Sequence, residues 1–309
     1  MEKVLTITLN PAIDKSTTTP FILPEKKLRC SAPKFEPGGG GVNVSRVLHK
    51  MGYSTTAMFL AGKHTGEFFR KLVEQEGIET LVVPIEGFTR ENLIVHDTSS
   101  DSQYRFGMPG PTVREHEWRS CLTEIKKAKD YAYIVISGSN PNGVPSDFYA
   151  QAADIVKEKK SKLVLDTSGD ALKYALDEGV FMAKPNLGEL SKLVGAQELD
   201  ANNVLAAARE IIYGGKAEML VVSMGAGGAM LVTGKEFYHE PAPPIKIKST
   251  VGAGDSMVAG ILIGLQKNLS LREVLRYGIA AGTAATMNAG TGLCTKENIE
   301  KIRSFFISE

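Results

Sequence analysis

The chain has 309 residues, of which 43% are hydrophobic and 23% charged, and its formal net charge is +1. A chain of this length buries a sizeable core without disulfides, and the small net charge provides no global field for nucleic acid or a membrane surface. The three cysteines, Cys30, Cys121 and Cys294, are scattered and odd in number, which favours a reducing compartment over a disulfide framework. No stretch approaches the ~20 apolar residues of a membrane span and no signal peptide is recognisable, so we expect a cytoplasmic protein without nucleic-acid or membrane partners.

Strand and helix patterns alternate along most of the chain. Short apolar runs predict strands at 4–9, 55–60, 80–83, 133–136, 162–165, 181–183 and 219–223. Helical periodicity predicts helices at 42–51, 65–75, 115–128, 145–157, 171–176, 187–193, 202–213, 255–266, 271–287 and 296–306. These units predict an α/β fold whose mostly parallel sheet is covered on both faces. Ligands of such sheets bind beyond the carboxyl ends of the strands.

Two segments, 15–35 and 90–107, break the alternation. They are polar, β-prone and without helical periodicity, which predicts a small second sheet over the mouth of the main one. Because no long linker or internal repeat is present, we expect a single domain, 1–309, with these segments as its lid. Arginine suits bidentate recognition of phosphate, so the lid's basic residues predict a phosphate clamp, although each taken singly is better explained as solvated charge. These residues are Lys27, Arg29, Arg90 and Arg105.

The most informative segment is residues 249–256, Ser-Thr-Val-Gly-Ala-Gly-Asp-Ser, which precedes an apolar run typical of a buried helix. Its glycines would lie at a helix N-terminus, where unpaired N–H groups and the helix dipole bind anions. Gly252, Ala253 and Gly254 would let a phosphate approach the backbone closely. Asp255, which we expect to be ionised there, could orient a hydroxyl and accept its proton late in phosphoryl transfer. On these residues alone, an ordinary turn with an aspartate near a helix start is an equally good explanation.

Other strand ends carry polar or glycine-rich sequences. The run 37–43, Pro-Gly-Gly-Gly-Gly-Val-Asn, opens the first helix, and four costly glycines predict a close approach to another group, with a flexible loop as the alternative. Asn43 could bind a hydroxyl or cap the helix. Asp14 and Ser139 each follow a predicted strand, where a substrate-binding group would lie, but ordinary loop residues explain them as well.

Two later strand ends suit a nucleotide and its metal. In Lys184-Pro-Asn186-Leu-Gly-Glu189 the spacing fits a plain capping box, or Asn186 and Glu189 could hold waters around Mg²⁺. The glycine-rich end that contains Ser223, Gly225 and Gly227 is no dinucleotide fingerprint, because a methionine occupies the position of its last glycine. The chain also contains no P-loop, no zinc-type histidine spacing and no GxSxG elbow.

Together these motifs make the chain resemble the ribokinase-like, PfkB family of sugar kinases over essentially its whole length. Both family signatures, at 38–43 and 250–255, are present, and so is the Asn-x-x-Glu motif at 186–189. The resemblance implies a three-layer sandwich with a β lid. Segments 27–30, 36–41, 103–110 and 249–257 are most similar to the bacterial minor 6-phosphofructokinase group. Gly40 stands where 1-phosphofructokinases and tagatose-6-phosphate kinases typically carry lysine, and Gly292 departs from the group's arginine.

The resemblance implies ATP-dependent phosphorylation of fructose 6-phosphate in glycolysis. The near alternatives are tagatose 6-phosphate or fructose 1-phosphate as the sugar, and the alternative of another class is a non-catalytic sugar-phosphate or nucleotide sensor. Asp255 would be the catalytic base beside an anion hole, Gly252 to Gly254. The implied sugar contacts are Asp14, Gly39, Asn43 and Ser139, with Arg90, Arg105 and a second subunit's Lys27 on the phosphate. The implied ATP contacts are Lys184, Asn186, Ser223, Gly225, Gly227 and Thr250. Glu189 would place Mg²⁺, and Ser249, Val251, Asn288 and Gly290 would bind K⁺. The family resemblance further implies a homodimer formed through the lid sheets.

Overall fold

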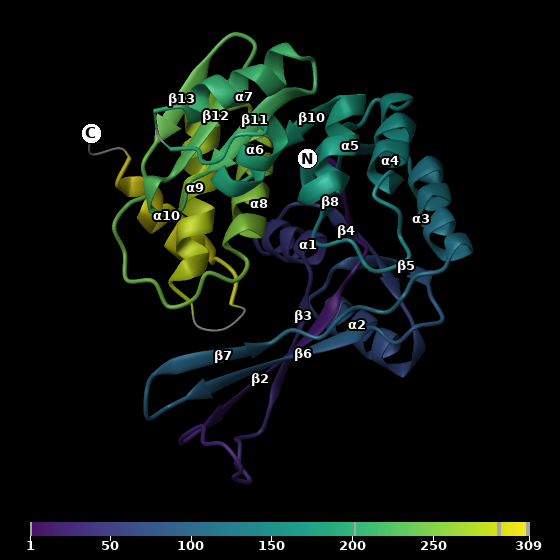
Figure 1. Cartoon of the computed structure of the whole chain (residues 1–309), viewed down its shortest axis with the longest axis vertical. Coiled ribbons are helices and arrows are strands. Elements are labelled where there is room, and N and C mark those ends of the chain that lie inside the picture. Colours follow the sequence, from purple (N-terminus) through teal and green to yellow (C-terminus); the bar gives the residue numbers. More distant parts are fainter. Residues whose placement is uncertain (1, 201, 289–291, 307–309) are drawn as a thin grey trace.

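The computed structural model describes residues 2–200, 202–288 and 292–306, and its centre is a nine-stranded sheet (Figure 1). The spatial order is β13-β12-β11-β10-β9-β8-β1-β4-β5. All strands from β11 to β5 in that order are parallel, whereas β12 runs antiparallel to both of its neighbours. The strand bounds are β1 (Lys3–Thr8), β4 (Thr55–Ala61), β5 (Glu79–Pro84), β8 (Tyr131–Ser137), β9 (Lys162–Asp166), β10 (Val180–Ala183), β11 (Ala217–Ser223), β12 (Ala229–Thr233) and β13 (Phe237–Glu240).

Helices cover both faces of this sheet, which confirms the predicted α/β three-layer fold. Successive residues of β8 show why, because Ile134 and Ile136 pack into one hydrophobic core while Tyr133 and Val135 pack into another. The first core is completed by α3 to α7, and the second by α1 and α8 to α10. The helix bounds are α1 (Gly40–Lys50), α2 (Lys63–Gln75), α3 (Glu115–Lys127), α4 (Phe148–Lys157), α5 (Gly169–Glu178), α6 (Leu187–Val194), α7 (Val204–Tyr213), α8 (Ala253–Gln266), α9 (Leu271–Thr286) and α10 (Lys296–Ser304). None of the helices in the described residues is both long and apolar enough to span a membrane.

The sequence patterns missed the hairpin of β12 and β13 at one edge of the sheet. Its turn, residues 234–236, begins with Gly234, and its first strand is buried, so turn and β-propensity signals were present. The glycine-rich stretch before the hairpin obscured them. The hairpin matters for the site because β13 leads into the segment that connects to α8.

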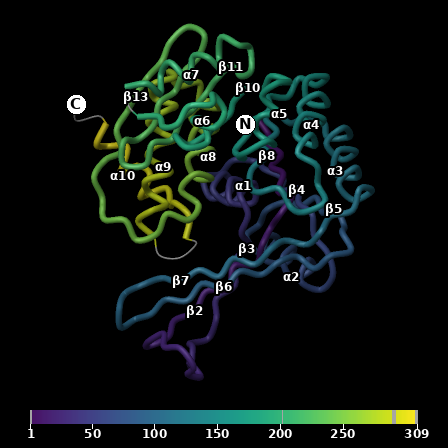
Figure 2. Tube along the Cα trace, viewed as in Figure 1, coloured from purple at the N-terminus to yellow at the C-terminus, as the bar shows by residue number. Residues whose placement is uncertain are grey.

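Four strands form a second, smaller sheet, the lid, with the order β3-β2-β6-β7. Their bounds are β2 (Ala12–Thr19), β3 (Lys34–Gly38), β6 (Arg90–Asp97) and β7 (Ser102–Phe106). Residues 20–33 contain no strand or helix. The lid projects from the central sheet, and the colours of the chain trace show that it is built only from two early stretches (Figure 2). Because β2 continues directly from β1 and β3 leads directly into α1, the lid is anchored at the carboxyl edge of the central sheet.

Candidate active site

Helix α8 begins at the carboxyl edge of the sheet with the backbone geometry expected of its glycines. Its N-cap, Gly252, has φ +71° and ψ +5°, and a Cβ there would lie 2.6 Å from Leu293 Cδ2. A side chain is therefore disfavoured by both conformation and space. A Cβ on Gly254 would lie 3.4 Å from Lys184 Nζ. Asp255 lies in the first turn, as predicted.

The Asp255 carboxylate is half-buried among groups from four other parts of the fold. Asn43 Nδ2 on α1 donates to its Oδ2 at 2.9 Å. Burial, and then the charge of Asp166, raise the pKa of Asp255 to about 7, while Asn43, Lys184 and Ser137 act in the opposite direction. The expectation that the helix N-terminus keeps Asp255 ionised is therefore wrong below neutral pH, because desolvation and a neighbouring carboxylate outweigh the dipole.

A buried ion pair lies beside Asp255. Lys184 Nζ is 3.0 Å from Asp166 Oδ1, and the lysine side chain is only 6% exposed. Burial lowers the pKa of Lys184, but the carboxylates of Asp166, Asp255 and Glu189 outweigh burial and leave the pKa above its usual value. Lys184 thus stays a cation between three carboxylates, where it can also attract a phosphate.

The glycine-rich run at the start of α1 is packed against protein. A Cβ on Gly40 would collide with Ser137 Oγ, and one on Gly41 would lie 2.6 Å from the Ile7 carbonyl. Gly39 is the N-cap, with φ +117°. The predicted close approach is therefore made to the ends of β1 and β8, and it lets the N-terminus of α1 reach the same edge as Asp255.

One face of the lid carries the charged groups predicted to bind substrate. Strand register places Asp14 opposite Asn92 on β6, and Asn92 Nδ2 donates to Asp14 Oδ1 at 2.9 Å. Burial raises the pKa of Asp14 despite this bond and the nearby Arg90. Arg90 donates to the carbonyls of Asn10 and Met108 at 3.1 and 3.2 Å. Asp14 and Arg90 therefore meet where the lid joins the central sheet.

Arg105 lies farther along the same face of the lid. It pairs with Ile94, four residues beyond Arg90 on β6, which is about 13 Å along the strand. Its Nη2 reaches the loop before α8 and donates to Ser249 Oγ at 3.1 Å. Arg105 thus reaches the loop before α8, whereas Arg90 stays where the lid joins the central sheet.

Two other predicted sugar contacts differ in their placement. Ser139 follows β8 at the carboxyl edge, where its hydroxyl accepts from Asn10 Nδ2 at 3.0 Å. Lys27 is exposed and belongs to the stretch between β2 and β3, which extends to the end of the lid remote from the central sheet (Figure 1). Lys27 is therefore not brought to the site of its own chain.

A cavity of about 500 Å³ lies next to the N-terminus of α8. Of the residues expected to contact ATP, Ser223, Gly225 and Thr250 line this cavity, whereas Gly227 is not among its lining residues. Its apolar walls come from the β13–α8 segment and from helices α8 and α9. They include Ala242, Pro243, Ile245, Met257, Ile279 and Thr283. An apolar slot that leads to a helix N-terminus can hold a flat heterocycle that carries phosphates.

The Asn186–Glu189 motif forms a reciprocal capping box. Asn186 Oδ1 accepts from the Glu189 backbone N–H, and Glu189 Oε2 accepts from the Asn186 N–H, both at 2.9 Å. In the part of the chain that the structure describes, no three acidic, histidine or cysteine side chains come together as a metal cage. Mg²⁺ in proteins keeps several waters and binds substrate phosphates. The Glu189 carboxylate near Lys184 is therefore suited to hold waters of a bound Mg²⁺ and not to contact the ion directly.

The positions implied for K⁺ lie on two adjoining segments. The N–H of Ser249 donates to the Thr286 carbonyl at 3.3 Å, which joins the loop before α8 to the end of α9. Asn288 Nδ2 donates to the Leu293 carbonyl at 2.9 Å. Val251 lies between Ser249 and the N-cap of α8. Gly290, the fourth implied position, lies outside the described residues.

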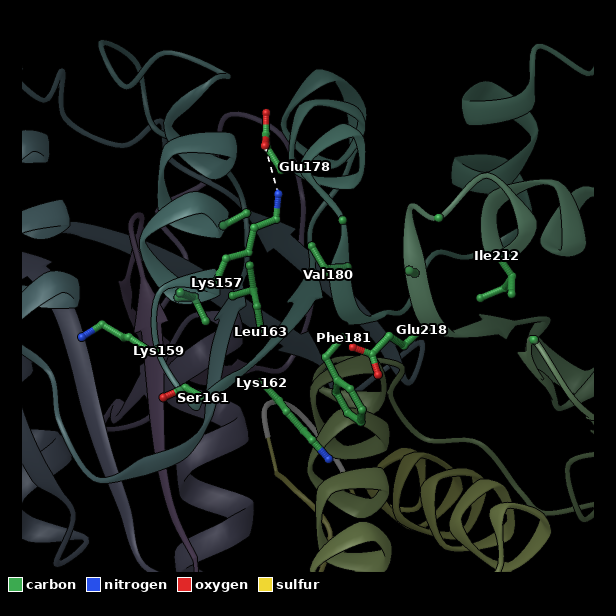
Figure 3. A pocket seen from close by; sticks show the side chains of 16 residues that line it. Lys157, Lys159, Ser161, Lys162, Leu163, Glu178, Val180, Phe181, Ile212 and Glu218 are labelled. Carbon is green, nitrogen blue, oxygen red and sulfur yellow. Dashed lines mark hydrogen bonds and ion pairs between the residues drawn. The ribbon is translucent and has the colours of Figure 1, made fainter.

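A second cavity, of about 620 Å³, lies at the opposite, amino-terminal edge of the sheet (Figure 3). Its basic groups already have partners: Lys157 Nζ lies 3.1 Å from Glu178 Oε2, and Lys159 Nζ donates to the Ala128 carbonyl at 2.8 Å. Lys162 Nζ lies 4.5 Å from the centre of the Phe181 ring. The basic side chains of this surface pocket are therefore paired with other groups of the protein.

Sequence reasoning assigned no role to Asp166, Asn92 or Arg46, which contact site residues directly. Asp166 follows a predicted strand, so the rule that selected Asp14 could have found it. Asn92 and Arg46 lie inside a strand and a helix, and their contacts depend on long-range packing that no local pattern contains.

Comparisons with known proteins agree with this geometry. The family model described as pfkB family carbohydrate kinase matches residues 4–298. The chain is 43% identical, over 99% of each chain, to ATP-dependent 6-phosphofructokinase isozyme 2 of Escherichia coli (strain K12). Solved structures of Escherichia coli phosphofructokinase-2 in complex with potassium and with fructose-6-phosphate match with TM-scores of 0.95 and 0.92, at 43% and 42% identity. The matches cover 99% of this chain and, respectively, 100% and 99% of those chains. With matches over nearly its full length, the chain belongs to the pfkB family of carbohydrate kinases.

Proposed function

We propose that this protein is an ATP-dependent 6-phosphofructokinase, which transfers the γ-phosphoryl group of MgATP to the free primary hydroxyl of fructose 6-phosphate. The product is fructose 1,6-bisphosphate, and the place of the reaction is glycolysis in the cytoplasm. Full-length similarity to the Escherichia coli 6-phosphofructokinase supports this substrate. Gly40 supports it too, because the lysine that 1-phosphofructokinases and tagatose-6-phosphate kinases typically carry there has no room beside Ser137 Oγ.

The observation that carries the proposal is the position of Asp255. It lies in the first turn of α8, whose first residues, Ala253 and Gly254, line the apolar cavity, and its Oδ2 accepts a hydrogen bond from Asn43 on α1, the helix that follows lid strand β3. A hydroxyl bound from the lid side and a phosphate bound from the cavity side would therefore meet at this carboxylate. Phosphoryl transfer needs alignment and charge stabilisation more than covalent chemistry, and this arrangement supplies both.

In the reaction, Asp255 accepts the hydrogen bond of the attacking hydroxyl and takes its proton as the P–O bond forms. The N–H groups at the start of α8, from Gly252 to Gly254, would face the charge that develops on the transferring group, although that of Ala253 also makes a long bond of 3.5 Å to the Thr250 carbonyl. Lys184 adds a fixed positive charge beside them. Because both groups are preorganised, little rearrangement is needed in the transition state.

The lid positions the sugar phosphate. Asp14, Asn43, Ser139 and the backbone at Gly39 bind its hydroxyls, and Arg90 and Arg105 bind its phosphate from two sides. Lys27, remote from its own site, would reach the phosphate bound by the partner in a homodimer that forms through the lid sheets. Closure of this assembly excludes water and limits ATP hydrolysis without sugar.

The nucleotide is held by the remaining strand ends. The adenine would occupy the apolar cavity beside Ser223, Gly225 and Thr250. Lys184, Asn186 and Gly227 do not line that cavity and would contact the rest of the nucleotide. When bound, Mg²⁺ neutralises phosphate charge, and Glu189 would hold its waters. K⁺ would bind carbonyls of the segments that contain Ser249, Val251 and Asn288.

The test is a coupled ADP-release assay with MgATP against fructose 6-phosphate, tagatose 6-phosphate, fructose 1-phosphate and fructose. We expect the largest kcat/KM for fructose 6-phosphate, and Asp255→Asn serves as the inactive control. Preference for another ketose phosphate would keep the chemistry and overturn the substrate. Binding without turnover of any sugar would overturn the enzyme in favour of a sensor.

A further inference from the structure

Arg46 is almost fully buried in α1, one turn after Asn43, and its guanidinium contacts several groups near the site. Its Nε and Nη2 donate to Glu76 Oε1 at 2.8 and 2.6 Å, and its Nη1 donates to the Pro37 carbonyl at 3.0 Å. The same Nη1 donates to Asn43 Oδ1 at 3.4 Å. The arginine side chain is only 3% exposed. An arginine with these partners is rigid, because its planar fork is held on several sides.

This contact determines which hydrogen-bonding group Asn43 offers to Asp255. Arginine can only donate, so Asn43 must turn its oxygen to Arg46 and its NH₂ to Asp255. The 2.9 Å bond from Asn43 Nδ2 to Asp255 Oδ2 shows that orientation. Without Arg46, the amide could rotate and accept a bond from protonated Asp255. A donor stabilises the carboxylate, whereas an acceptor would stabilise the acid.

We infer that Arg46 is a positioning residue: it fixes Asn43 as a donor and so holds Asp255 in the form that can accept the proton of the sugar hydroxyl. This inference rests on the proposed kinase activity, with Asp255 as its base. Arg46 also holds the lid, because its Nη2 lies 3.6 Å from Glu36 Oε1 on β3, the residue that pairs with Asp14. One guanidinium therefore secures both the sugar-binding strand pair and the orientation of the base.

The first experiment compares the pH dependence of kcat, at saturating MgATP and fructose 6-phosphate, for the wild type, Arg46→Met and Arg46→Lys. Besides Asn43, the groups that face Asp255 are Asp166 of β9, Lys184 after β10 and Ser137 of β8, and these stay the same in all variants. We expect the acid limb of the profile to move to higher pH in Arg46→Met, with kcat at pH 7 about tenfold lower. Arg46→Lys retains a donor and should recover part of both effects.

The matched control is Arg276→Met, which removes another arginine, on α9, that is paired with two carboxylates, Glu240 of β13 and Glu273 of α9. Its acid limb should coincide with that of the wild type. If Arg46 serves only the stability of the fold, both methionine variants will lower the melting temperature and neither will move the acid limb. That result would overturn the inference.

A double-mutant cycle tests whether Arg46 acts on Asp255 through Asn43. In an Asn43→Ala background, Arg46→Met should move the acid limb no further, since that effect passes through Asn43. Additive shifts of the acid limb would overturn the inference, even with an active wild type. If Arg46→Met does not fold, Glu76→Gln can replace it, because this change weakens the ion pair that fixes the Arg46 guanidinium. The double-mutant cycle of Glu76→Gln with Asn43→Ala then tests the same inference. A wild type that never phosphorylates fructose 6-phosphate would instead refute the proposed function.

Discussion

Replacing Asp255 by asparagine should abolish turnover and, at the same time, stabilise the fold at alkaline pH. The pKa of Asp255 is raised from its usual value of 3.8 to about 7, chiefly by burial. The folded protein therefore binds this proton more tightly than the unfolded chain does. The resulting stability is complete below the unfolded pKa, is lost as pH rises through the folded pKa, and is constant above it.

The magnitude follows from the two pKa values. From pH 5 to the folded pKa is two pH units, and each unit corresponds to about 1.4 kcal/mol, so the wild type should lose at most about 3 kcal/mol that the asparagine variant does not lose. The neutral amide titrates nowhere in this range and can still accept the bond from Asn43.

The assay is urea denaturation at pH 5 and pH 8, followed by the fluorescence of the single tryptophan, Trp118, which is buried in the core. The difference in unfolding free energy between Asp255→Asn and the wild type should widen with pH. The exposed Asp154→Asn is the control and should show no such widening. A difference that is constant with pH, or a wild type that is the more stable protein at pH 8, would refute the reasoning.

Three further predictions concern the surroundings of Asp255. Lys184→Met leaves Asp166, whose side chain is only 16% exposed, without its cation, so the unfolding free energy in urea should fall by about 3 kcal/mol and the KM for MgATP should rise; unchanged values of both would contradict the ion pair's role. Gly252→Ala forces a side chain onto a left-handed N-cap 2.6 Å from Leu293, so kcat should fall at least about tenfold, whereas Gly195→Ala, left-handed but in open space, should cost about 1 kcal/mol of stability and keep native kcat. Arg105→Gln should raise the KM for fructose 6-phosphate about tenfold in initial-rate measurements, and an unaltered KM would remove Arg105 from the phosphate site.

Local patterns predicted most of the fold because the elements on which the site depends have strong periodic signals. Helix α8 is apolar on nearly all sides and its N-cap is a glycine. The sequence therefore predicted both where the helix starts and that Asp255 lies in its first turn. The β12–β13 hairpin was missed because it is short and follows four residues of glycine-rich turn. The lid strands were recognisable only as departures from alternation, and their parallel β2–β6 pairing joins segments too distant for a local pattern to connect.

The chemistry of the site was less predictable than its location. The prediction that Asp255 is ionised rested on the dipole of α8 alone. It did not take account of Asp166, which the fold brings near Asp255 from β9 and which raises the pKa of Asp255. The four glycines of the α1 loop indicated a close approach correctly, but only the structure shows that the close groups are Ser137 and Ile7. Such contacts are set by the register of elements, which sequence periodicity leaves open.

The bond between Asn43 and Asp255 spans 212 positions of the chain, and this separation has a consequence for synthesis. On the ribosome, the lid strands and α1 emerge first, and α8 emerges only after all the strands of the central sheet. A nascent chain that ends before α8 therefore lacks Asp255 and the helix N-terminus around it. The contact between Asn43 and Asp255 can form only when α8 has packed against α1, after most of the chain has been made.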